Sequence, residues 1–154
     1  MKISTQTHIL SKIYGEENAI RKLAEIGYDA YDFSMFDIQD NNHPISRSDF
    51  DSYVYKLRRV EDESGIVCNQ SHAPFPSYLK DDDDYNRRIF PFLVRAIEVT
   101  AMLGGKIVII HPAVFPDHKI GGSPECLKAN MELYHSLLPY AKKCNVKIAL
   151  ENMY

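Results

Sequence analysis

Short apolar runs alternate with longer amphipathic segments along the whole chain. Five runs are typical of buried β-strands, and between them apolar residues recur every three or four positions, the period of a helix. The predicted strands are Lys2–Gln6, Ala30–Ser34, Ile66–Gln70, Ile107–Ile110 and Val146–Leu150. Four helices are expected. The first covers about residues 16–26, and the second begins after an N-cap at Ser48 and ends at Gly65. The third ends at Gly104 and Gly105, and the fourth begins after an N-cap at Ser123. The third of these helices has Pro91 either in its first turns or at its start.

Strictly alternating strands and helices predict a parallel α/β fold. The last two strands are almost continuously apolar, as expected when helices cover one face of a sheet and packed side chains fill the other. In the last helix, an apolar stripe is expected to be buried: Leu127, Met131, Tyr134, Leu137, Leu138 and Ala141.

Two architectures fit this pattern. One is an open five-stranded doubly wound sheet, and the other is the first five units of a TIM barrel, truncated after strand five. The turn after strand one, residues 5–10, lacks the glycines of a phosphate-binding loop, and the chain stops just past a strand rather than on a covering helix. We therefore expect residues 1–154 to be the N-terminal five βα units of a single (β/α)8-type domain. An exposed apolar edge at strand five would then favour a homo-oligomer.

Composition narrows the class of protein. The chain has 154 residues, 45% hydrophobic and 25% charged, which is typical of one globular domain. No apolar stretch reaches the roughly 20 residues of a membrane span, and the N-terminus lacks the apolar core of a signal peptide. The three cysteines have no close spacing, so neither a disulfide framework nor a zinc ribbon is indicated, and a cytoplasmic location is expected. A net charge of -3 argues against nucleic acid as a partner.

Three side chains that can bind metal follow predicted strands. His72 comes after the third strand, His111 after the fourth and Glu151 after the fifth. In parallel α/β proteins the carboxyl ends of the strands form the edge where ligands bind. A lone histidine is more often structural, but two histidines and a glutamate at one edge favour a shared site.

The donor types indicate which ion would bind. Imidazole nitrogens with a carboxylate suit zinc, manganese or cobalt better than magnesium or calcium. Such an ion would polarise a carbonyl or diol oxygen, while the second oxygen of Glu151 accepts a proton. His8, after strand one, is a weaker candidate for the same pocket, in a polar loop; His43, His118 and His135 are expected on the surface.

The segments around these residues resemble those of the xylose-isomerase-like TIM barrels. The resemblance is carried by Ser71-His72-Ala73-Pro74-Phe75, Ile110-His111-Pro112 and Leu150-Glu151-Asn152-Met153, in order and spacing. That superfamily contains sugar and sugar-phosphate isomerases and epimerases, inosose-handling enzymes and abasic-site nucleases of the endonuclease IV type.

The resemblance implies roles for these residues. In the epimerases the residue matching Glu151 is a metal ligand and one of two acid/base carboxylates. The histidines matching His72 and His111 are zinc ligands in the nuclease branch, and contact substrate or lie just behind the ligands in the isomerases. The family's other ligands, on strands six to eight, have no counterpart among these residues, so the 154 residues alone are not expected to complete the site.

We therefore expect the N-terminal part of a metal-dependent sugar or sugar-phosphate isomerase or epimerase. Glu151 would be the catalytic residue, with His72, His111 and His8 near a small-molecule sugar substrate. One alternative is a zinc-dependent abasic-site endonuclease, which the acidic run Asp81–Asp84 disfavours. Another is a noncatalytic α/β domain that self-associates.

Overall fold

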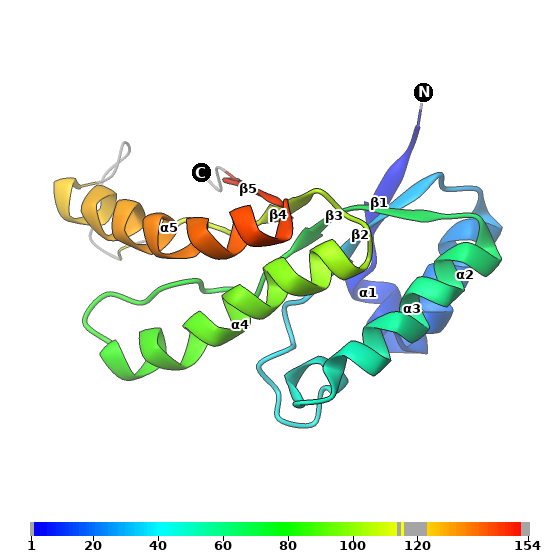
Figure 1. Cartoon of the computed structure of the whole chain (residues 1–154), viewed down its shortest axis with the longest axis horizontal. Coiled ribbons are helices and arrows are strands. Elements are labelled where there is room, and N and C mark those ends of the chain that lie inside the picture. The colour runs from blue at the N-terminus through cyan, green and yellow to red at the C-terminus, as the bar shows by residue number, and fades with distance from the viewer. Residues whose placement is uncertain (1, 114, 116–122, 152–154) are drawn as a thin grey trace.

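The computed structural model describes residues 2–113, 115 and 123–151, in which each strand is followed by one or two helices before the next strand begins (Figure 1). The elements, in chain order, are β1 (Ser4–Gln6), α1 (His8–Tyr14), α2 (Glu16–Ile26), β2 (Ala30–Ser34), the 3₁₀ helix η1 (Pro44–Ser46), α3 (Phe50–Ser64), β3 (Val67–His72), α4 (Asp83–Met102), β4 (Ile107–Ile109), α5 (Pro124–Cys144) and β5 (Lys147–Ala149).

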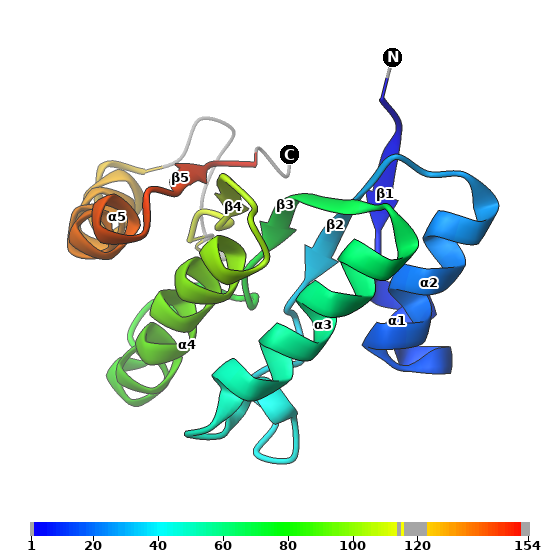
Figure 2. The same cartoon turned by 45° about the vertical axis from the view of Figure 1, so that its right-hand side comes forward.

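The sheet is parallel, and its strands lie side by side in the order of the sequence, β1-β2-β3-β4-β5. Helices α2, α3, α4 and α5 lie on the outer side of the curved sheet (Figures 1 and 2). A doubly wound sheet reverses its strand order and carries helices on both faces. The alternative of an open doubly wound sheet is therefore wrong, and the arrangement is that of consecutive units of a TIM barrel. In the part of the chain that the structure describes, β1 and β5 each pair with one strand.

The main core lies between the sheet and the helices. From β2, the fully buried rings of Tyr31 and Phe33 belong to the same apolar cluster as Leu57 of α3 and Leu93 of α4. The alternation of β2 therefore divides its residues between the helix layer and the concave face of the sheet, toward which Asp32 is directed. None of the helices within the described residues is long and apolar enough to cross a membrane.

Helix boundaries follow the capping residues. The Asp82 side chain accepts a hydrogen bond from Tyr85 N, so α4 begins at Asp83 and contains Pro91 in its interior rather than starting there. In α5 the Ser123 hydroxyl caps Cys126 N, and Asn145 ends the helix in the left-handed conformation at φ 52°.

Two features differ from the expectation. Helix α1 begins at His8, where a polar loop was expected. All seven of its residues are described and none is buried, so the helix has no buried apolar stripe from which the sequence could have predicted it. In α5, Leu137 and Ala141 are buried, but Leu127, Met131 and Leu138 are exposed. The prediction of one buried stripe is wrong because no described element packs on that side of α5.

Candidate metal centre

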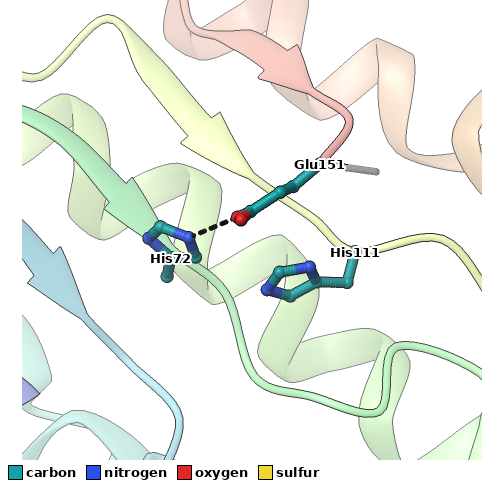
Figure 3. Close-up of side chains that lie close together, drawn as sticks. All are labelled: His72, His111 and Glu151. Atoms are coloured by element: carbon teal, nitrogen blue, oxygen red, sulfur yellow. Dashed lines mark hydrogen bonds and ion pairs between the residues drawn. The ribbon is translucent and has the colours of Figure 1, made fainter. Parts of the chain in front are cut away.

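Three strands carry His72, His111 and Glu151 to the carboxyl edge of the sheet, where their side chains point toward one another (Figure 3). His72 is the last residue of β3, and His111 and Glu151 each lie two residues beyond the end of β4 and β5. One ligand atom from each lies within 4.8 Å of the other two. Both histidines are buried, whereas the Glu151 side chain is 48% exposed. Three of the expected site residues are therefore neighbours in space.

A β-bulge in β3 aims His72 at this site. Tyr31 pairs with Cys68, but the next residue, Asp32, pairs with Gln70, so Asn69 is an extra residue in β3. The extra residue reverses the alternation of β3 beyond it. Without the bulge, His72 would face the helices instead of the concave side of the sheet.

The side chain of Ser71 is consistent with this reversal. Its hydroxyl hydrogen-bonds the Thr100 hydroxyl of α4 and is buried against the helix layer, as Cys68 is three residues earlier. In a regular strand, residues three apart face opposite sides.

His72 is held by carboxylates on both sides of its ring. Its Nδ1 lies 2.9 Å from Asp32, and its Nε2 lies 3.0 Å from Glu151 Oε2. Burial lowers the pKa of His72, but the hydrogen bonds and charges of Asp32 and Glu151 outweigh it, so the pKa is raised above its usual value. Each ring nitrogen of His72 thus lies within hydrogen-bonding distance of a carboxylate.

His111 has the opposite electrostatic character. Burial, together with the neighbouring His72 ring 5.5 Å away between centroids, lowers the pKa of His111. A neutral imidazole keeps a lone pair free for a cation. The His111 ring also packs against Phe75 in a T-shaped arrangement, with 5.2 Å between the ring centroids.

The residues present fit a divalent cation. Among the described residues, the buried Nδ1 of His111 has no hydrogen-bond partner, and leaving such an atom unpaired costs free energy. Zinc binds nitrogen and carboxylate oxygen at about 2.0–2.2 Å, so its ligands lie at most roughly 4 Å apart. The donor atoms of the three residues lie within 4.8 Å of one another, and His72 Nε2 and Glu151 Oε2 are 3.0 Å apart, close to the spacing that such an ion requires.

His8 lies beside the centre but not in it. Its ring packs edge-on to Phe36 at 5.1 Å, and Phe36 in turn packs against His72 at 5.8 Å. His8 Nδ1 is 3.4 Å from the Ser34 hydroxyl, and the residue lines a separate cavity of about 240 Å³. The Phe36 ring therefore separates His8 from the two buried histidines.

The remaining histidines differ from one another. His135 is exposed, as expected, and His118 lies outside the described residues. His43 is not a simple surface residue, because its Nε2 lies 3.1 Å from the buried Glu16 and its Nδ1 accepts a hydrogen bond from Ile45 N. The expectation that His43 is a surface residue is therefore wrong. The same contacts hold His43 in its position as the N-cap of η1.

Asp32 is the site residue that the sequence analysis missed. It is 6% exposed, contacts His72, and accepts a 2.6 Å hydrogen bond from Gln70 Nε2. A signal was present, because Asp32 interrupts an otherwise apolar strand between two aromatic residues. A carboxylate in such a position is rarely buried unless a partner compensates for the loss of water.

Both the sequence and the fold of the chain are similar to those of known proteins. A family model described as xylose isomerase-like TIM barrel matches residues 20–154. Among curated proteins, none matches the sequence. Solved structures match over nearly the whole chain, and the chain spans about half of their length.

Three of these structures illustrate the likeness. A D-tagatose 3-epimerase-like protein has a TM-score of 0.74 and 22% identity, covering 99% of this chain and 53% of its own. D-allulose 3-epimerase from Methylomonas sp., in complex with D-allulose, has a TM-score of 0.70 and 18% identity, covering 100% and 52%. The IOLI protein with a binding zinc atom has a TM-score of 0.66 and 19% identity, covering 97% and 51%. At these identities the likeness establishes the fold.

Proposed function

The chain belongs to the xylose isomerase-like TIM barrel family, and on that premise we propose that it forms part of a metal-dependent isomerase or epimerase of sugars or sugar phosphates. The observation that carries the proposal is the convergence of His72, His111 and Glu151 at the carboxyl edge of the sheet. Structures of similar fold include sugar 3-epimerases, one of them with D-allulose bound.

The donor set supports a divalent cation of the zinc, manganese or cobalt type. His72 Nε2, one nitrogen of His111 and one oxygen of Glu151 would hold the ion. A bound cation would polarise a carbonyl or hydroxyl oxygen of the sugar and stabilise negative charge that develops there. Any further ligands would come from outside the described residues or from a second copy of the protein.

Glu151 is the residue that we assign to proton transfer. Epimerisation at a carbon next to a carbonyl requires removal of its proton and its return on the other face, and aldose–ketose exchange through an enediol uses the same kind of base. The half-exposed carboxylate has two oxygens, so one can bind the ion while the other accepts the proton. The two buried histidines, His72 and His111, complete the site beside Glu151.

Glu151→Gln in the full protein provides the decisive test. The protein is stripped of metal, reloaded with zinc or manganese, and assayed for bound metal, ketose 3-epimerisation and aldose–ketose exchange. We expect the variant to lose at least about 100-fold in activity, because it lacks the base. Glu132→Gln, an exposed glutamate of α5, is the matched control and should behave as the parent. Full activity and metal content in Glu151→Gln would refute the assignment.

A zinc-dependent abasic-site nuclease is the second candidate. It is favoured by one observation, namely that two buried imidazoles and a carboxylate form a zinc-type donor set. The exposed acidic run at residues 81–84 and the net charge of -3 oppose binding to a DNA backbone. Cleavage of an abasic-site duplex, with binding that weakens steeply with salt, would favour this candidate.

A noncatalytic domain that self-associates is the remaining alternative. It would be favoured if the purified protein were dimeric and contained no stoichiometric metal.

A further inference from the structure

Asp32 is held in a position that affects His72 alone among the three candidate ligands. Asp32 is 6% exposed, and its carboxylate lies 2.9 Å from His72 Nδ1, on the side of the ring away from Glu151. Gln70 donates a 2.6 Å hydrogen bond to Asp32 Oδ2. The bulge in β3 places Gln70 directly opposite Asp32, so the two side chains share one face of the sheet.

We propose that Asp32 is a positioning residue that fixes the tautomer and orientation of His72 for cation binding, with Gln70 fixing Asp32 in turn. The inference rests on the proposed metal site and adds to it a residue that never touches the ion. A carboxylate accepts hydrogen bonds, so it retains the proton on Nδ1 of a neutral His72. The lone pair is then on Nε2, the nitrogen that faces Glu151.

The alternative tautomer would be incompatible with a cation held between Nε2 and Glu151, because Nε2 would then carry a proton instead of a lone pair. A proton on Nε2 would place the lone pair of Nδ1 against the Asp32 carboxylate, where two acceptors would repel each other. The ring cannot exchange its nitrogens by flipping without losing the same hydrogen bond. Histidine ligands of metal ions commonly donate their other N–H to such a partner, and its loss typically costs 10- to 100-fold in metal affinity.

Affinity for zinc in the full protein tests the inference. Zinc binding is measured by competition with a chromophoric chelator for the parent, Asp32→Ala and Asp32→Asn. We expect the two substitutions to weaken binding about 10- to 100-fold. Asp37→Asn is the matched control, because Asp37 follows the same strand but its side chain is 58% exposed and pairs with Lys12. The control should bind zinc as the parent does.

The tautomer itself gives a second readout, which a residue of purely structural importance would not change. Long-range ¹H–¹⁵N correlation spectra of the zinc-loaded protein, assigned with His72→Gln, distinguish a protonated Nδ1 from a metal-bound Nε2. The parent should show the proton on Nδ1, and Asp32→Ala should show an altered or mixed pattern. Gln70→Met offers a milder perturbation if the Asp32 variants fold poorly, and should weaken zinc binding by a smaller factor.

The outcomes separate the two claims. Parent-like zinc affinity in the folded Asp32 variants, or binding of zinc through Nδ1 of His72, would overturn the inference while the metal site stands. Absence of zinc binding in the parent, or binding unaffected by Glu151→Gln, would remove the metal site and the inference together.

Discussion

The Ser77 hydroxyl donates a 2.5 Å hydrogen bond to the backbone carbonyl of His111. Both residues are buried, so this bond ties the loop after β3 to the loop after β4, directly behind the candidate metal centre. A buried carbonyl that loses its partner costs about 1–3 kcal/mol.

Ser77→Ala should therefore lower the free energy of unfolding by about that amount, 1–3 kcal/mol, as measured by urea titration of the full protein. Ser136→Ala is the matched control, because Ser136 also donates from its hydroxyl to a backbone carbonyl, that of Glu132, but on an exposed face of α5. Its cost should stay below about 0.5 kcal/mol. Equal effects of the two substitutions would contradict a special role for the buried bond.

The closeness of the three candidate ligands could be foreseen because parallel strands share an edge at their carboxyl ends. His72, His111 and Glu151 each follow an apolar run, and the alternation of strands and helices requires the runs to be parallel. The position of the three residues at the carboxyl edge of the sheet is therefore enough to predict that they lie close together, even when none of their contacts is known. The alternation alone left the strand order open between a doubly wound sheet and a barrel, and the absence of phosphate-loop glycines after strand one helped to favour the barrel.

Features that depend on long-range contacts could not be predicted in this way. The partnership of Asp32 with His72 requires the bulge at Asn69, and no local pattern indicates where an extra residue enters a strand. Periodicity also shows which residues of a helix are apolar, but not whether another element covers them. Met131 of α5 follows the helical period and is exposed, because its neighbours in the described structure lie on the other side.

Arg95 of α4 anchors the segment between β2 and α3. Its Nη1 donates to the carbonyls of Ile45 at 2.7 Å and Arg47 at 2.9 Å, and its guanidinium lies 3.9 Å from the centre of the Phe50 ring. A lysine cannot reproduce a planar group that stacks and donates at the same time. Arg95→Lys should therefore cost about 1–2 kcal/mol of unfolding free energy.

Limited proteolysis provides a local measurement for Arg95→Lys, which should increase cleavage within residues 35–49. Arg87→Lys is the control, because Arg87 lies on the same helix with a side chain that is 72% exposed and paired with Asp84. Unchanged cleavage of Arg95→Lys, relative to this control, would argue against the anchoring role.

Glu61 makes stability depend on pH. Its side chain is 1% exposed, and its Oε1 accepts hydrogen bonds from the Tyr31 hydroxyl at 2.5 Å and from Cys68 N at 3.1 Å. Burial raises the pKa of Glu61 above its ordinary value of 4.5, although these bonds and Arg58 oppose the shift. The folded protein thus binds this proton more tightly than the unfolded chain does.

It follows that the contribution of Glu61 is fully present below about pH 4.5 and is lost as the pH rises through the folded-state pKa. Glu61→Gln cannot titrate, so its urea midpoint should fall less than that of the parent over this range. Glu132→Gln, which removes an exposed carboxylate, should keep the pH profile of the parent. Parallel profiles for the parent and Glu61→Gln would disprove the raised pKa.

A bound cation should stabilise the full protein through the three candidate ligands. An ion that binds the folded state alone adds about 2.7 kcal/mol at a free concentration 100 times its dissociation constant. Zinc should therefore raise the melting temperature, and a chelator should reverse the rise. His111→Ala should abolish most of the effect, because it removes the buried imidazole whose Nδ1 has no other partner in the described structure.

His135→Ala removes an exposed histidine from α5 and should leave the zinc-dependent shift intact. If both variants retain the shift, zinc binds elsewhere on the protein and the ligand assignment is wrong.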